Sequence, residues 1–240
     1  MMGGRRRILI VAALAAAVVV AAAFTLRQGG KMMADTNNPE HSVKLPDPRR
    51  DSETSVEKAL LKRRSVRSYA DQPLTLAQVS QILWAAQGVT EPSRGLRTAP
   101  SAGALYPLEV YVVAGKVEGL PAGIYKYVPR SHTLTRVAEG DKRSELAAAA
   151  LNQNWIAEAP IILVVSAVYD RTAVKYGTRA TRYVHIEVGH AAQNVCLQAV
   201  ALGLGAGVVG AFDDNGVARV LSAPSSEAPL YILPVGKPAK

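Results

Sequence analysis

The chain has 240 residues and a mass of 25.4 kDa. Its hydrophobic fraction of 49% is ordinary for a globular protein and excludes a disordered chain. The single cysteine, Cys196, excludes an intramolecular disulfide and any metal site built from several cysteines. The net charge is +9, but five of the 28 basic residues precede the first acidic residue, Asp35, which leaves 23 against 19 acidic residues. Nucleic-acid binding is therefore not expected.

Residues 1–27 have the order of a targeting segment. Three arginines at 5–7 precede nineteen uncharged residues, Ile8–Leu26, which predicts a signal peptide or an N-terminal membrane anchor. The arginines would stay in the cytoplasm, so the rest of the chain is expected outside it. They also resemble a twin-arginine export signal. The alternative is a cytoplasmic protein whose translation starts at Met32 or Met33.

Residues 28–55 are expected to form a polar linker, because they are rich in proline and charged residues and show no apolar period. The domain then spans residues 56–240. Its first elements are predicted as helices at 56–63 and 76–86, a strand at 108–114, a hairpin over 124–128 and 134–137, and a helix at 144–151.

Two later segments decide the fold class. Residues 161–168 are almost continuously apolar, which predicts a strand covered on both faces. Residues 183–202 predict a long helix that is apolar nearly all round, as in a domain centre or a subunit interface. Strands at 208–212 and 230–235 and a short helix at 217–221 are expected after it. This order predicts an α+β domain with a mixed sheet flanked by helices.

Three segments carry candidate chemistry. Arg63, Arg64, Ser65 and Arg67 place three guanidinium groups and a hydroxyl at a helix end, where they could bind a phosphate or form a solvated surface cluster. Residues 100–107 form a small-residue loop before a strand, and 203–210 are glycine-rich. Both permit close backbone approach to a ligand or form plain turns.

Other sites are not supported. His185 and His190 are five residues apart on one helix, so they diverge, and no metal site is expected with Glu187. Cys196 has no cation beside it in the sequence and is expected to be a core residue. No nucleophilic serine stands between glycines, so hydrolase chemistry is not indicated.

Taken together, Arg63–Tyr69, Pro100–Pro107, Glu187–Asn194, Gly203–Gly205 and Val235–Pro238 resemble the FMN-dependent nitroreductase superfamily, in its azoline-dehydrogenase-like, SagB-type branch. The resemblance covers residues 56–238. It implies a homodimer with two FMN molecules at the interface and the long helix at its centre.

The resemblance also implies site residues. Arg63, Arg64, Ser65, Arg67 and Lys237 would hold the phosphate and ribityl end of FMN. Ser101, Ala102 and Gly103 would line the flavin, from the partner chain, and Val208, Val209 and Gly210 would approach its N5 edge. The Lys-Tyr pair of this branch is matched by Lys175 and Tyr176, and more weakly by Arg182 and Tyr183.

The expected function is an FMN oxidoreductase that transfers hydride through flavin N5 in a ping-pong cycle on a small organic substrate. NADH or NADPH is one candidate electron donor, although an exported enzyme would need another. Oxidation of peptide azolines is not favoured, because this chain carries an export segment and no evident peptide-docking extension. The alternatives are a membrane-tethered flavin-binding module without turnover and a structural protein without flavin.

Overall fold

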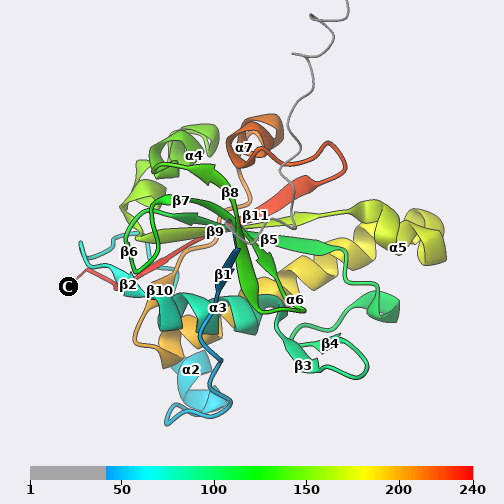
Figure 1. The fold of residues 1–240 in the computed structure, drawn as a ribbon, viewed down its shortest axis with the longest axis horizontal. Helices are drawn as coiled ribbons and strands as arrows, with labels where there is room; N and C mark the ends of the chain where they lie inside the picture. Colours follow the sequence, from blue (N-terminus) through cyan, green and yellow to red (C-terminus); the bar gives the residue numbers. More distant parts are fainter. Residues whose placement is uncertain (1–41, 240) are drawn as a thin grey trace, which may run out of the picture. The chain divides into compact units, whose positions relative to one another are not determined.

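The computed structural model describes residues 42–239. The predicted targeting segment, residues 1–27, lies outside these described residues. A seven-stranded sheet is covered on one face by α4 (Arg143–Ala149) and α7 (Asp214–Leu221), and on the other by α3 (Leu76–Gln87) and α6 (Ala180–Ala201) (Figure 1). Between residues 42 and 239, no helix is long and apolar enough to cross a membrane. The predicted α+β class with helices on both sides of a sheet is confirmed.

The main sheet has the strand order β1-β8-β7-β5-β9-β11-β10, and its neighbouring strands are antiparallel. Parallel pairing occurs between two short strands, β2 and β6, and in the bridge from Ser65 to Ala206 at the β10 edge. The strands are β1 Ser42–Lys44, β2 Leu74–Thr75, β3 Val89–Glu91, β4 Leu96–Arg97, β5 Leu108–Ala114, β6 Val117–Glu118, β7 Gly123–Val128, β8 Thr133–Glu139, β9 Ile161–Ala167, β10 Gly205–Ala206 and β11 Ala228–Gly236.

The central strand β9 explains the sheet's position. All seven of its residues are buried. Leu163 and Val165 pack with α3 and α6, whereas Ile162 and Val164 pack with α4 and α7. Alternate side chains thus enter two separate cores, which is why the sequence of this strand has no polar face. The prediction of a strand covered on both faces is confirmed.

Local signals place the helices as expected. Ser55 caps α2 (Val56–Lys62) by accepting the Lys58 N–H, and Thr75 forms a capping box with Gln78 at the start of α3. Three predictions of extent differ from the structure by three residues or more. The helix α6 begins three residues before Tyr183, and α7 begins three residues before Val217. Residues 208–212 contain only a bridge from Val209 to Ile232 rather than a strand.

Residues 42–49 belong to the folded domain, although the sequence predicts a linker there. β1 pairs with β8, and Leu45 is buried in the core. Ser80 donates to the Pro46 carbonyl at 2.5 Å, and the Arg49 N–H donates to Gln81 Oε1 at 2.8 Å. Hydrogen bonds to its backbone hold this segment against the domain. The pattern of apolar residues in the sequence does not reveal such hydrogen bonds.

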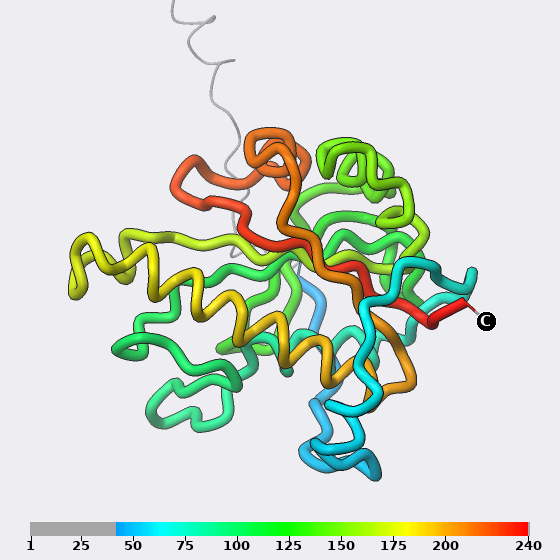
Figure 2. Tube along the Cα trace, turned by 180° about the vertical axis from the view of Figure 1, so that it is seen from behind, coloured from blue at the N-terminus to red at the C-terminus, as the bar shows by residue number. Residues whose placement is uncertain are grey.

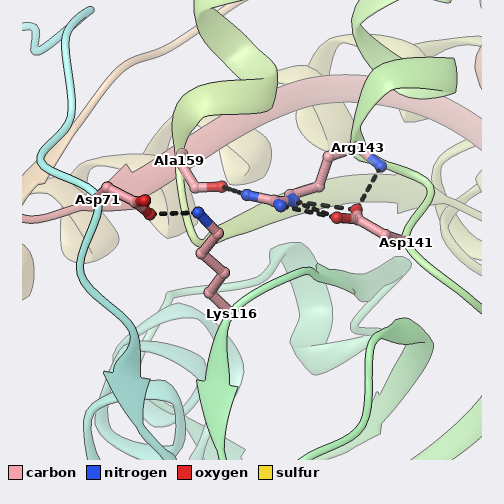
Figure 3. Close-up of polar contacts among 5 residues, drawn as sticks. All are labelled: Asp71, Lys116, Asp141, Arg143 and Ala159. Carbon is pink, nitrogen blue, oxygen red and sulfur yellow. Dashed lines mark hydrogen bonds and ion pairs between the residues drawn. The ribbon is translucent and has the colours of Figure 1, made fainter.

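A buried arginine fixes the turn between the sheet and α4 (Figure 3). Arg143 is 9% exposed. Its Nε and Nη2 donate to the two carboxylate oxygens of Asp141 at 2.9 and 2.7 Å, and its Nη1 donates to the Ala159 carbonyl at 2.9 Å. Beside it, Lys116 pairs with Asp71. The Arg143 side chain passes so close to Gly115 that a Cβ there would lie 1.8 Å from Nε.

We therefore expect Gly115→Ala to lower the free energy of unfolding by about 3 kcal/mol, because the methyl group displaces a buried, paired guanidinium. Gly119→Ala is the matched control. Its Cβ meets nothing within 4 Å, so only the positive φ of 75° costs energy, about 1–2 kcal/mol. Urea unfolding of both variants measures the difference. Equal losses would show that Arg143 moves aside freely.

Candidate active site

The first cluster of candidate residues lies where three distant segments meet. Residues 65–70 run beside β10 and the end of β11, and Figure 2 shows this cyan segment next to the red C-terminal strand. Val66 N–H donates to the Ala206 carbonyl at 3.1 Å, and Ala70 N–H donates to the Lys237 carbonyl at 2.8 Å. The structure therefore brings the arginine-rich segment, the glycine-rich segment and Lys237 together.

Tyr69 fastens these segments to one another. Its buried hydroxyl donates to the carbonyl of Val66 or Pro234, at 2.9 and 3.0 Å, and accepts the Gly207 N–H at 3.1 Å. Gly207 is tightly enclosed, because a Cβ there would lie 2.8 Å from the Trp155 ring and from the Val66 carbonyl oxygen. The glycine at this position thus serves close packing within the cluster.

The cations of this cluster differ in their surroundings. Arg67 lies over the Trp155 ring, with Cζ 5.8 Å from the centroid. The Arg64 side chain turns back and donates to the Leu61 and Arg63 carbonyls at 3.0 and 2.7 Å. Among the described residues, no acidic side chain forms an ion pair with Arg63, Arg67 or Lys237. Cations without an acidic partner suit an anionic group.

The second cluster is built on the loop of residues 101–106. Gly103, Ala104 and Tyr106 have positive φ values of 64°, 53° and 48°. Ala and Tyr rarely adopt this conformation, so the surrounding contacts must hold the loop in place. Tyr106 N–H donates to Ser101 Oγ at 2.9 Å, and the Arg97 guanidinium lies over the Tyr106 ring at 4.5 Å.

Helix α5 (Tyr169–Tyr176) brings the predicted Lys-Tyr pair to this loop. A Cβ on Gly103 would lie 3.0 Å from Tyr176 Oη and 3.1 Å from Lys175 Nζ. Arg171 anchors the helix, because it donates to the Tyr106 carbonyl at 3.2 Å and pairs with Glu109. Lys175 and Tyr176 are therefore neighbours of the 101–103 loop.

The two clusters attach to different parts of α6. Tyr176 of the second cluster packs edge-on against Tyr183 near the start of α6, with ring centroids 4.9 Å apart, whereas the glycine-rich segment of the first cluster follows the end of this helix. From Tyr183 to Ala201, the last residue of α6, the helix rises by about 27 Å. The resemblance implied one set of residues around a single FMN. Within one chain, these residues are divided between the two clusters.

Comparisons with known proteins give the family. A model of the nitroreductase family matches residues 60–237. A protein of Methanocaldococcus jannaschii, named as a nitroreductase, is 51% identical over 195 residues, which are 81% of this chain and 96% of the relative.

The chain belongs to the nitroreductase family.

Solved structures agree with this membership. A crystal structure from Ralstonia eutropha, described as a nitroreductase, has a TM-score of 0.74 and 32% identity, and the match covers 83% of this chain and 90% of the other.

The microcin B17-processing protein McbC of Escherichia coli is 28% identical over 62% of this chain and 57% of its own length. The E. coli microcin synthetase McbBCD, solved with truncated pro-MccB17 bound, matches at a TM-score of 0.67 and 26% identity over 75% of this chain and 70% of the matched chain.

Sequence reasoning on this nitroreductase-family chain missed three residues at the two clusters. Trp155 packs on Gly207 and under Arg67, and Gln153 donates to the Ala211 carbonyl at 3.1 Å beside the glycine-rich segment. Glu187 is buried on α6, whereas His185 forms a hydrogen bond of 2.6 Å with Tyr169. The spacing of single aromatic and amide residues carries no signal for the first two. A carboxylate in an otherwise apolar helix face was the available signal for Glu187.

Proposed function

We propose that this chain is an FMN-dependent oxidoreductase that transfers two electrons as hydride between small organic molecules. The observation that supports it best is the first cluster, where the backbone of residues 65–70 pairs with Ala206 and Lys237, and the Arg67 guanidinium lies over the Trp155 ring that packs on Gly207. When bound, FMN would supply the hydride-accepting and hydride-donating chemistry. The protein's residues then supply binding, orientation and proton transfer.

The donor set fits a flavin phosphate. Arg67 would bind phosphate oxygens with its planar guanidinium, and the Trp155 ring beneath limits the orientations of that group. Val208, Val209 and Gly210 come directly after Gly207 in the chain. The backbone of Val209 is held by two hydrogen bonds to the backbone of Ile232, of 2.9 and 3.0 Å. This fixed backbone would lie along the reacting edge of the flavin.

The second cluster would cover the flavin and handle the substrate proton. Ser101, Ala102 and Gly103 would contact the ring system, and we assign Lys175 as general base, with Tyr176 beside it. Lys175 Nζ lies 5.5 Å from the Tyr176 ring centroid. The ring and the loop restrict where the ammonium group can sit.

A homodimer would complete the site, since one chain places the two clusters at different parts of α6. Large apolar side chains are exposed on the neighbouring helices α2 and α6. Leu60 is 53% exposed, Leu61 73% and Ile186 50%. Burying such side chains against a second copy is favourable.

The similarity to McbC supports placement in the azoline-dehydrogenase-like branch, and it makes a five-membered azoline a candidate substrate. A nicotinamide nucleotide is the candidate donor if the chain works in the cytoplasm. If residues 1–27 carry it out of the cytoplasm, as we propose, the donor must be another reductant.

The deciding experiment is an absorption spectrum of the purified chain from Asp35 onward after incubation with FMN, followed by anaerobic titration with NADH, NADPH and a small thiazoline. A bound flavin bleached by one of these supports the oxidoreductase. A bound flavin that none of them reduces favours a flavin-binding module without turnover. A folded protein that takes up no flavin overturns the proposal.

A further inference from the structure

Helix α5, which carries Lys175 and Tyr176, has almost no apolar core of its own. Of its eight residues, only Thr172 is buried. A helix of this length is not stable alone in water, so contacts with the rest of the chain decide where it lies. The position of the proposed general base therefore depends on a few identifiable side chains.

Arg171 connects this helix to the loop of the second cluster. Its Nη1 donates to the Tyr106 carbonyl at 3.2 Å, and its Nη2 donates to Glu109 in an ion pair. Lys175 lies four residues later, which places it on the same face of the helix, and it lies beside Gly103 of the loop. The same face of α5 is thus attached to the end of the loop and carries the proposed base to its middle.

Glu109 is itself fixed by charges on the sheet. Its Oε2 lies 3.2 Å from the Lys126 ammonium group on β7, and this ammonium group also pairs with Glu227 at 2.6 Å. Glu227 accepts the Tyr111 hydroxyl at 2.7 Å. The side chains of Glu109 and Glu227 are only 14% and 5% exposed, so solvent screens these pairs weakly. Arg171 therefore pairs with a carboxylate whose position the sheet determines.

The other contacts of α5 reach α6 and not the loop. Tyr169 and His185 form a hydrogen bond of 2.6 Å at one end of the helix, and Tyr176 packs edge-on against Tyr183 at the other. Within residues 42–239, the hydrogen bond from Arg171 is the one that joins a side chain of α5 to the loop. The separation between helix and loop is thus set at Arg171.

We propose that Arg171, supported by Glu109, is a positioning residue that holds Lys175 at a fixed distance from the loop that would cover the flavin. The attachment of the helix concerns the chain alone. Its effect on the reaction rests on the proposed function, in which Lys175 removes the substrate proton. A base must lie within hydrogen-bond distance of that proton, so a displaced helix slows proton transfer without removing a contact to FMN.

The first test needs neither flavin nor substrate. Hydrogen exchange of the folded, flavin-free chain, read by mass spectrometry, reports how often backbone amides open. The amides of residues 172–176 should exchange about five- to tenfold faster in Arg171→Ala than in wild type, the effect of one charged hydrogen bond and a partly exposed ion pair. Glu109 keeps Lys126 as a partner, so the central strand Ile161–Ala167 should exchange as in wild type.

Arg179→Ala is the matched control for this experiment. Arg179 is an exposed cation in the single turn after α5, and it forms no ion pair within residues 42–239. Its loss removes the same charge beside the same helix. The amides of residues 172–176 should then exchange at the wild-type rate.

The second test uses the flavin-loaded protein. Arg171→Ala should slow anaerobic flavin reduction by a small thiazoline by about tenfold, while the FMN dissociation constant stays within about threefold of wild type. In a chain that already carries Lys175→Ala, the same change should slow reduction by less than about twofold, because no base remains to be displaced. A general loss of structure would slow the reaction equally in both chains.

Three outcomes would overturn the inference. Amides of residues 172–176 that exchange at the wild-type rate in Arg171→Ala would show that α5 does not depend on this arginine. Equal acceleration in α5 and in Ile161–Ala167 would show that Arg171 stabilises the whole domain. An equal slowing with and without Lys175 would show that Arg171 does not act through the base. A wild-type chain that binds no flavin would instead overturn the proposed function, while the exchange series still decides whether Arg171 holds the helix.

Discussion

Replacing Arg67 with alanine is expected to weaken FMN binding by about 10- to 100-fold, because a hydrogen-bonded charge pair with phosphate contributes about 1.5–3 kcal/mol. Arg67 is exposed, lies over the Trp155 ring and has no acidic partner among the described residues. Its guanidinium is thus free to bind an anion. Fluorescence titration of the flavin-free protein with FMN measures the change.

Arg64→Ala is the matched control, since it removes the same charge three residues away. The Arg64 guanidinium donates to the Leu61 and Arg63 carbonyls at the end of α2, so its loss should change FMN affinity by less than about threefold. If both variants bind FMN equally well or equally poorly, the arginines act only through net charge, and the specific role of Arg67 is wrong.

Lys175→Ala should slow anaerobic flavin reduction by a small thiazoline by about 100-fold or more, the usual contribution of a general base. The residue lies beside Gly103 in the loop that would cover the flavin, so its amine is within reach of a substrate bound there. Stopped-flow absorbance of the flavin band gives the rate. The FMN dissociation constant should stay within about threefold of wild type, because Lys175 belongs to the second cluster.

Arg182→Ala serves as the comparison for Lys175→Ala. Arg182 is an exposed cation near the start of α6 and belongs to the weaker of the two candidate pairs. Its loss should leave the rate nearly unchanged. A normal rate in flavin-loaded Lys175→Ala would exclude Lys175 as the base, and a slow rate in Arg182→Ala would move the assignment to the Arg182–Tyr183 pair.

Most of the core could be predicted from the sequence, because burial leaves a periodic pattern. The strand Leu108–Ala114 has the predicted bounds, and Ile161–Ala167 differs by one residue. The elements that were missed are short strands and α5, whose eight residues carry four polar or charged side chains and only one buried residue, Thr172. Such segments are held by hydrogen bonds to distant residues, which no local pattern reveals.

The sequence pointed to the candidate site through its charged and glycine-rich segments. The fold brings the backbone of residues 65–70 beside Ala206 and Lys237, and the role of these residues in FMN binding stays a prediction. Sequence reasoning could not separate the roles of neighbouring arginines. Arg64 and Arg67 cannot be distinguished in the sequence. In the structure, the Arg64 guanidinium donates to a backbone carbonyl of α2, whereas the Arg67 guanidinium lies over the Trp155 ring. That distinction depends on Trp155, which lies 88 residues after Arg67 in the chain.

The placement of the two clusters along α6 has a consequence for how the protein would behave on dilution. In the proposed dimer, each catalytic centre would take its phosphate-binding cations from one chain and its covering loop from the other. A separated chain would keep one half of each of two catalytic centres and no complete centre. The specific activity would therefore decrease as the protein is diluted, even while every chain stays folded. Two variants, one defective at Arg67 and one at Lys175, would also restore one working centre when mixed as a heterodimer.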